Sequence, residues 1–316
     1  DFAASALGLK QVHPAAVNPE VRVIYLVPSD REPRNDYQVV MANALRHLQM
    51  WYWAELSEGK TFLPHNPVVE TVRSRRDSLW FTTNQTGDNP GLNLWFNAVA
   101  ESSAKFNDPD FIYLVYADVD ATGQSIGGTS GVALLARHDL EVLAGEHPSE
   151  LVCRSVGGLG HELGHALGLP HPPECDSHQA ADDSPPCQSL MYLGYLTYPA
   201  THFTDGHKGQ LLSNPFITSQ PSSQPSKSCF DLAQAGPFVG SAVFEGKKEL
   251  TIEGRFGDAA RVIINGKDRT KFVTGTSETL ILLTAKKKKL GIKSGDNTLQ
   301  VTDATGFVSN IVTIQL

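Results

Sequence analysis

Three histidines and one glutamate lie within the stretch His161 to His171, which reads HELGHALGLPH. His161 and His165 are four residues apart, so on a helix their side chains lie on one face, one turn apart. Two imidazoles at that spacing can bind one zinc ion at about 2.0–2.1 Å. Glu162, next to the first histidine, can take a proton from a metal-bound water and pass it to a leaving amine. The pattern therefore predicts metal-assisted hydrolysis.

Gly168 and Pro170 predict how a third histidine reaches the same ion. Gly168 has no Cβ, so it can adopt the left-handed conformation that ends a helix. Pro170 keeps the chain from resuming a helix, so His171 can turn back as a third ligand. Three protein ligands leave the fourth zinc position open, as is typical of a catalytic zinc site.

The pattern HExxHxxGxxH resembles the signature of the metzincin clan of zinc endopeptidases. All five defining residues of the motif are present: His161, Glu162, His165, Gly168 and His171. The resemblance covers the catalytic half of the chain. It implies an α+β fold in which a mixed, twisted sheet carries an active-site helix. It also implies a Met-turn beneath the metal, for which residues 189–192 (SLMY), with Met191, are the candidate.

The resemblance implies a tyrosine that assists at the zinc, two residues after the methionine in several metzincin families. Leu193 stands at that position. Tyr192 and Tyr195 are therefore the candidates for stabilising the developing oxyanion.

An edge strand above the cleft is a further implication, because such a strand can bind extended substrate through its unpaired backbone groups. Gly128, Thr129 and Ser130 lie where that strand is expected. The alternative is a loop that leads into an ordinary strand.

Together these features predict a zinc-dependent endopeptidase that acts on a protein or peptide with one catalytic Zn2+ and with Glu162 as the base. Two alternatives stay open: a surface adhesion or binding protein with a vestigial protease fold, and a zinc hydrolase of non-peptide amides, such as those of a cell wall. Glu162 counts against the adhesion protein, because an active site that has lost its activity does not need a base. Ca2+ could bind at two acidic groups, although neither has the spacing of a recognised calcium loop: Asp118 with Asp120, and Asp176 with Asp182 and Asp183.

The length and net charge of the chain limit its possible domain number and its possible partners. A chain of 316 residues can form one large or two ordinary domains. The net charge of −8 argues against a nucleic-acid partner. No apolar run approaches the roughly 20 residues of a membrane span. We expect a monomer without a membrane span.

The four cysteines include no CxxC pair. A Cys175–Cys187 bond would hold a polar, proline-rich loop and leave Cys153 to pair with Cys229. The other two pairings, or free thiols in a reducing cytosol, stay open. Disulfides are favoured beside a zinc protease, so a secreted or extracytoplasmic protein is predicted. The chain begins at Asp1 without methionine, which suggests a trimmed or mature form.

The elements that must position the site follow from periodicity. Ser149 is a predicted N-cap for the helix that carries the zinc motif. Gly157, Gly158 and Gly160 would each weaken that helix by about 1 kcal/mol relative to Ala. We interpret them as positions where another element packs closely. The remaining expected elements are strands at 21–27, 62–72, 111–119 and 132–135 and helices at 36–56, 89–105 and 205–212.

The chain is predicted to divide at a Ser/Pro/Gln-rich linker. The metallopeptidase domain spans 1–218, the linker 219–235 and a small all-β sandwich 236–316. The stretches ELTIEGRFGDAARVIINGK and NTLQVTDATGFVSN resemble the Ig-like TIG/IPT domains appended to secreted and surface proteins. Such a domain could contact a surface or a glycan. The lysine run 286–289 is expected to be a solvated loop.

Overall fold

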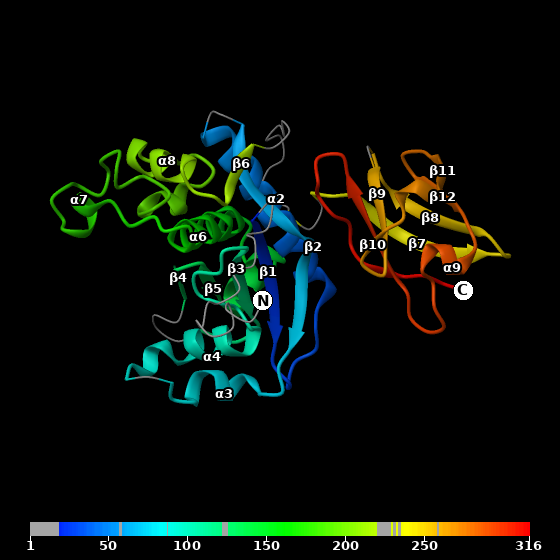
Figure 1. Cartoon of the computed structure of the whole chain (residues 1–316), viewed down its shortest axis with the longest axis horizontal. Coiled ribbons are helices and arrows are strands. Elements are labelled where there is room, and N and C mark those ends of the chain that lie inside the picture. Colours follow the sequence, from blue (N-terminus) through cyan, green and yellow to red (C-terminus); the bar gives the residue numbers. More distant parts are fainter. Residues whose placement is uncertain are drawn as a thin grey trace, which may run out of the picture.

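The computed structural model describes residues 19–56, 59–86, 88–121, 126–219, 229, 232, 235–257 and 259–316. Most of the predicted linker, namely 220–228, 230, 231, 233 and 234, lies outside the described residues. The chain forms an N-terminal α+β part and a C-terminal all-β part (Figure 1). The elements of the N-terminal part are β1 (Glu20–Val27), α2 (Asn35–Glu55), β2 (Lys60–Arg73), α3 (Ser78–Thr83), η1 (Pro90–Leu92), α4 (Asn93–Ser102), β3 (Phe111–Ala117), β4 (Gly127–Thr129), β5 (Val132–Leu135), α5 (Arg137–Leu143), α6 (Glu150–Ala166), α7 (Pro173–Asp176), η2 (Leu193–Thr197), α8 (Asp205–Leu212) and β6 (Ile217–Ser219).

One mixed sheet organises the N-terminal part, with the strand order β4-β5-β3-β1-β2-β6. The four inner strands are parallel, while β4 and β6 pair antiparallel at the two edges. The central strands β1 and β3 are almost continuously buried, as expected for parallel strands that are covered on both faces. The predicted α+β class with a mixed sheet is confirmed.

The two faces of this sheet have separate cores. Val23 and Tyr25 of β1 pack with α2 and α6 on one face, while Ile24 and Leu26 pack with α3 and α4 on the other. This follows from the alternation of side chains along a strand. Figure 1 shows α6 on one side of the sheet and α3 and α4 on the other. The helix that carries the zinc motif thus packs on a sheet whose other face is covered by α3 and α4.

Most of the predicted elements occur with shifted ends, and β5 and α8 have the predicted bounds. The helix expected at 89–105 is split into η1 and α4. The sequence reading missed α3, α5 and α7, which have only four to seven residues and too few turns to give a clear periodicity.

The helix that carries the zinc motif, α6, begins as predicted after Ser149, which is its N-cap residue, but the serine side chain does not cap it. Ser149 has αR backbone angles and makes no side-chain capping hydrogen bond. The prediction of close packing holds for two of the three glycines. A Cβ on Gly157 would lie 2.7 Å from Cβ of Tyr198, and one on Gly160 would lie 2.8 Å from Cδ1 of Leu48. Gly158 faces open space, so for this residue the prediction was wrong.

The C-terminal part consists of two four-stranded antiparallel sheets, β10-β9-β13-β14 and β11-β12-β8-β7, around a core of their own. The predicted lysine loop at 286–289 instead includes a helical turn, α9. The elements are β7 (Phe238–Glu245), β8 (Glu249–Arg255), β9 (Ala259–Ile264), β10 (Lys267–Asp268), η4 (Thr270–Phe272), β11 (Val273–Thr276), β12 (Leu280–Thr284), α9 (Lys287–Leu290), β13 (Thr298–Asp303) and β14 (Val312–Thr313).

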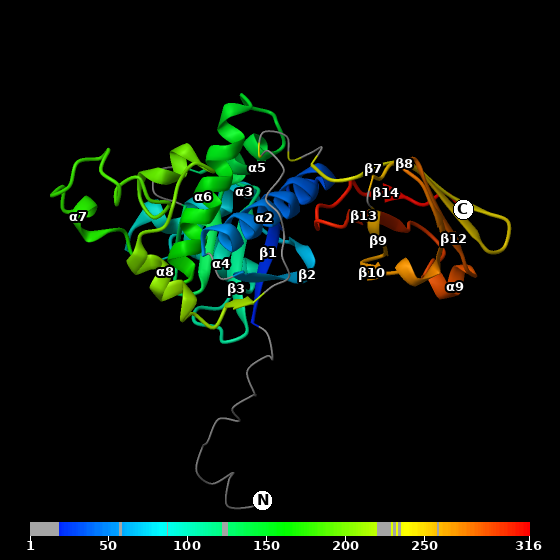
Figure 2. The same ribbon diagram turned by 90° about the horizontal axis from the view of Figure 1, so that it is seen from above.

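Asn43, a buried polar residue of α2, joins the two parts. Its side-chain oxygen accepts from the backbone nitrogen of Val308 at 2.9 Å. Its amide nitrogen donates to the carbonyl oxygens of Leu232 at 2.8 Å and Val308 at 3.3 Å. Figure 2 shows the loop that follows β13 reaching toward α2. The contact fixes one side of the C-terminal part against a helix of the N-terminal part.

Two disulfide bonds, Cys153–Cys229 and Cys175–Cys187, are present. The first ties α6 to the segment that precedes the C-terminal sheets. A bilayer-spanning helix is absent from the part of the chain that the structure describes, because no helix there combines the needed length with enough apolar side chains.

Candidate metal centre

The Nε2 atoms of His161, His165 and His171 converge on one point. They lie 3.1 Å apart for His161 and His165, 3.0 Å for His165 and His171, and 3.3 Å for His171 and His161. Two tetrahedral ligands at zinc–nitrogen distances of about 2.0–2.1 Å are about 3.3 Å apart. The three separations therefore suit one shared zinc ion, and these histidines form a group that could hold a metal.

The second nitrogen of each imidazole faces an oxygen. Nδ1 of His161 is 2.8 Å from the carbonyl oxygen of Leu190, and Nδ1 of His165 is 2.8 Å from that of Leu169. Nδ1 of His171 is 2.9 Å from Oδ1 of Asp176. An Nδ1–H that donates to these oxygens leaves the lone pair on Nε2, which is the tautomer a metal requires. All three side chains are thus oriented by acceptor oxygens of the protein itself.

Burial also disfavours the protonated form of two of these imidazoles. Burial, with smaller contributions from the neighbouring His165 and His171, lowers the pKa of His161 to about 4. Burial also lowers the pKa of His165. The protonated forms are disfavoured, and metal binding requires the neutral ones.

A left-handed glycine brings His171 back to the helix. Gly168 has φ of +92°. Its backbone nitrogen donates to the carbonyl oxygen of His165 at 3.0 Å, and that of Leu169 donates to the carbonyl oxygen of Gly164 at 2.9 Å. These two bonds form a Schellman motif, which ends α6 and reverses the chain.

Glu162 follows His161 on α6, and part of its carboxylate is buried. Its Oε2 atom is buried and has no hydrogen-bond partner within the described protein. Burial raises the pKa of its carboxyl group to about 7, with a smaller contribution from Asp139. A buried carboxylate oxygen without a partner is unusual, because it loses hydration without compensation. The three oriented imidazoles and this oxygen fit a bound zinc ion together with a water.

Met191 is fully buried beneath α6. A Cβ added to Gly164 would overlap its Sδ atom and lie 2.9 Å from its Cε atom. Gly164 directly precedes His165, so the thioether supports the helix where the second histidine leaves it. The absence of a side chain at Gly164 makes this contact possible.

The two candidate tyrosines lie against different histidines. The ring of Tyr195 meets that of His161 edge-on, with centroids 5.5 Å apart, and the ring of Tyr192 meets that of His171 at 5.6 Å. The hydroxyl of Tyr192 donates to the carbonyl oxygen of Cys175 at 3.3 Å. Tyr192 is therefore held by the disulfide loop, and Tyr195 is the better placed of the two for a role at the site.

The expected substrate strand is an edge strand. β4 contains Gly128 and Thr129, and Ser130 follows it with φ of +49° in the tight turn to β5. Among the described residues β4 pairs with β5 alone, so its other side has no strand partner there. A Cβ on Gly128 would overlap the carbonyl oxygen of Glu162 and lie 3.1 Å from Cβ of His165. The strand therefore lies directly against the metal-binding turn of α6.

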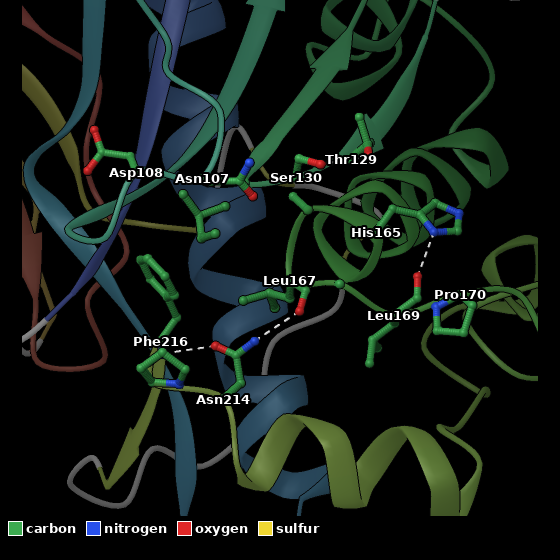
Figure 3. A pocket seen from close by; sticks show the side chains of 16 residues that line it. Asn107, Asp108, Thr129, Ser130, His165, Leu167, Leu169, Pro170, Asn214 and Phe216 are labelled. Carbon is green, nitrogen blue, oxygen red and sulfur yellow. Dashed lines mark hydrogen bonds between the residues drawn. The ribbon is translucent and has the colours of Figure 1, made fainter.

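A cavity of about 520 Å³ opens beside this strand (Figure 3). Its wall includes His165, the end of α6 and the segment after α8. Asn214 fixes that last segment through a hydrogen bond to the carbonyl oxygen of Leu167 at 2.9 Å. Asn107, Asp108, Thr129 and Ser130 add polar side chains, and Phe216 adds an aromatic ring. Of the three histidines, His165 is the one that contributes to the wall of this cavity.

The acidic groups considered for calcium have other contacts. Asp118 is buried; it accepts from the hydroxyl of Tyr25 at 2.9 Å and from Nη1 of Arg137 at 3.3 Å. Asp176 faces His171, as described above. Neither Asp118 with Asp120 nor Asp176 with Asp182 and Asp183 is among the groups of described residues that could hold a metal. These contacts give no support to a calcium site.

No protein-family model matches the chain, and no curated protein matches it either. The similar solved structures include two of OgpA from Akkermansia muciniphila. The wild-type OgpA structure is 17% identical, with a TM-score of 0.41, and the match covers 98% of this chain and 97% of OgpA. The structure of catalytically inactive OgpA with an O-glycopeptide (glycodrosocin) substrate is 17% identical, with a TM-score of 0.40 and coverage of 98% and 96%.

A third structure contains the CBM32-1, CBM32-2 and M60 catalytic domains of ZmpB from Clostridium perfringens. It is 10% identical, with a TM-score of 0.17, and the match covers 92% of this chain and 40% of the other. None of these similarities assigns the chain to a family.

The expected membership of the metzincin clan was wrong. No family model matches the chain, and the similar structures include those of OgpA and of an M60 catalytic domain. The interpretation of residues 189–192 as the Met-turn of that clan, and of the C-terminal sheets as an Ig-like TIG/IPT domain, is withdrawn with it. The motif HExxHxxGxxH is short, and it carried the resemblance almost alone. The contacts of the histidines, Glu162 and Met191 do not depend on the clan.

Sequence reasoning missed the groups that orient the histidines. Asp176 is an acidic residue five positions after His171, and this spacing was a usable signal. The carbonyl oxygens of Leu169 and Leu190 gave no signal, because any residue offers a backbone carbonyl.

Proposed function

We propose that the chain is a zinc-dependent endopeptidase. The observation that carries the proposal is the convergence of three Nε2 atoms, each on an imidazole whose Nδ1 faces an oxygen, beside the unpartnered Oε2 of Glu162. His161, His165 and His171 would hold the metal. A zinc ion bound there supplies a Lewis acid that polarises a scissile carbonyl and lowers the pKa of a water.

The protein's own groups would carry the proton transfers. Glu162 accepts a proton from the attacking water and returns it to the nitrogen of the departing amine. Its burial suits this role, because a carboxyl group with a pKa near neutrality can both take up and release a proton. Tyr195 is the residue that we assign to the developing oxyanion.

The edge strand β4 supports the proposal that the substrate is a peptide. Residues Gly128 to Ser130 would pair with an extended chain through their backbone groups, and the polar cavity beside them would take a side chain or a group attached to one. An O-glycopeptide belongs among the substrates to be tested, because OgpA binds one. The two disulfide bonds support an oxidising, extracytoplasmic location.

The test compares wild type with Glu162→Gln, which keeps the shape of the side chain and removes its basicity. Glu150→Gln, an exposed substitution in the first turn of the same helix, is the matched control. Each protein is incubated with a peptide library and with O-glycopeptides, cleavage sites are read by mass spectrometry, and zinc content is measured in parallel.

We expect cleavage by wild type and by Glu150→Gln, loss with a chelator and recovery with zinc. Glu162→Gln should retain zinc and lose at least about 10²-fold in rate. The proposal fails if the zinc-loaded wild type cleaves none of these substrates or if Glu162→Gln cleaves as fast as wild type. Cleavage of glycopeptides alone would narrow the substrate class and leave the mechanism intact.

A further inference from the structure

A second group of metal-binding side chains lies near the start of α6, at the opposite end of this helix from the zinc histidines. His138 and Glu141 are on α5, and His147 lies in the connection from α5 to α6. Their ligand atoms all lie within 4.8 Å of one another. We propose that His138, Glu141 and His147 form a second zinc site that is independent of the catalytic one.

The local backbone of this group resembles that of the first site, because in both a left-handed glycine follows a helix and precedes a histidine. His138 and Glu141 are three residues apart, so they are neighbours on the helix surface. Gly145 has φ of +81°. Its backbone nitrogen donates to the carbonyl oxygen of Val142 at 3.0 Å, and that of Glu146 donates to the carbonyl oxygen of Glu141 at 2.9 Å. This is again a Schellman motif. It reverses the chain and places His147 beside the pair on the helix.

The separation of His147 and Glu141 suits a shared ion as well as a weak direct contact. Nε2 of His147 and Oε2 of Glu141 are 3.4 Å apart, which is long for a hydrogen bond. Two tetrahedral ligands at zinc distances of about 2.0–2.2 Å are about 3.4 Å apart. The ring centroids of His138 and His147 are 4.7 Å apart, the same distance as between His165 and His171 in the first site.

A neighbouring group already orients the carboxylate. Nε of Arg137 donates to Oε1 of Glu141 at 2.6 Å, which leaves Oε2 on the side of His147. A metal-binding carboxylate is typically held by such a hydrogen bond on its other oxygen. Two imidazoles and one carboxylate form a ligand set that zinc accepts. The exposed side chain of His138 leaves the site open to an ion from solution.

Zinc at this position would join α5 to the residues that lead into α6. Because α5 packs on α2 and α6, the bound ion would hold the start of the active-site helix. The expected consequence is a stability that rises with zinc beyond the amount needed to fill the catalytic site.

The test counts zinc equivalents on the full chain. Metal-free protein is titrated with zinc by calorimetry, and bound zinc is measured after dialysis; His138→Ala, His147→Ala and an exposed control, His178→Ala, are treated alike. We expect two equivalents for wild type and for His178→Ala. The two test variants should keep the tighter equivalent and lose the other or bind it at least about tenfold more weakly.

Thermal unfolding gives a second measurement. The unfolding temperature of wild type should continue to rise after the first equivalent, and that of His138→Ala should not. Binding of one equivalent by wild type in excess zinc would overturn the proposal. It would also be overturned if both test variants kept the second equivalent, or if His178→Ala lost it.

Discussion

Gly157 and Gly158 are adjacent in α6. Replacement by alanine should change the stability of the protein in opposite directions at these two positions. Alanine removes the intrinsic helix penalty of glycine at either position, a gain of about 1 kcal/mol. At Gly158 a Cβ meets nothing within 4 Å, so the gain should be realised. At Gly157 a Cβ would lie 2.7 Å from Cβ of Tyr198 and closer still to the carbonyl oxygen of Tyr195.

The difference between the two variants isolates the cost of this overlap. Ordinary van der Waals contact begins at 3.4 Å, so the helix or η2 must move by roughly 0.7 Å or more. Neither atom is the free end of a flexible side chain. Overpacking of this kind costs about 1–3 kcal/mol. With about 2–4 °C per kcal/mol for a domain of this size, Gly157→Ala should unfold about 2–12 °C below Gly158→Ala.

Thermal unfolding by circular dichroism on zinc-loaded protein would measure this difference. Gly158→Ala should unfold at or above the wild-type temperature. Because the ring of Tyr195 lies against His161, Gly157→Ala should also bind zinc more weakly, and Gly158→Ala should not. If Gly157→Ala unfolds at the same temperature as Gly158→Ala or above it, the reasoning about close packing between α6 and η2 is refuted.

Three further predictions concern the metal, the disulfides and a buried acid. Asp176→Asn should keep the fold and weaken zinc binding by about 10–100-fold, because the hydrogen-bond acceptor of His171 loses its charge; unchanged affinity in a competition titration would contradict this. The loop-entropy relation gives about 4.5 kcal/mol for the Cys153–Cys229 bond and about 2.8 kcal/mol for Cys175–Cys187, from sequence separations of 76 and 12. Urea unfolding of the two Cys→Ser pairs should therefore show the larger loss for the first pair, and the reverse order would count against the relation here. Burial raises the pKa of Asp118 to about 6, above its ordinary value of 3.8. Since the folded state then binds more protons than the unfolded state between these values, stability should fall as pH rises from about 4 to 6. Asp118→Asn should remove that part of the dependence, and an unchanged pH profile would refute the assignment.

The sequence was most informative where one physical rule dominates. The apolar strand at β3 and the periodic helix α2 follow from burial, and both were found within two residues of their ends. The spacing of His161, His165 and His171 predicted a single cluster, because a helix followed by a left-handed glycine restricts where the third side chain can go.

Prediction from the sequence failed where contacts between residues far apart in the chain determine the structure. The carbonyl oxygens that orient His161 and His165 are contributed by backbone, and the open space at Gly158 depends on the path of η2. The clan assignment failed for a different reason. A short motif specifies a ligand geometry, and unrelated folds can present the same geometry.

The Cys153–Cys229 bond gives the chain a second covalent path between its two parts. A cut in any peptide bond between residues 154 and 228 would leave the pieces joined through the two sulfur atoms. A nicked molecule would therefore migrate as one species on a non-reducing gel and as two only after reduction. Such a nick would therefore not release the C-terminal sheets from the helix that carries His161 and His165.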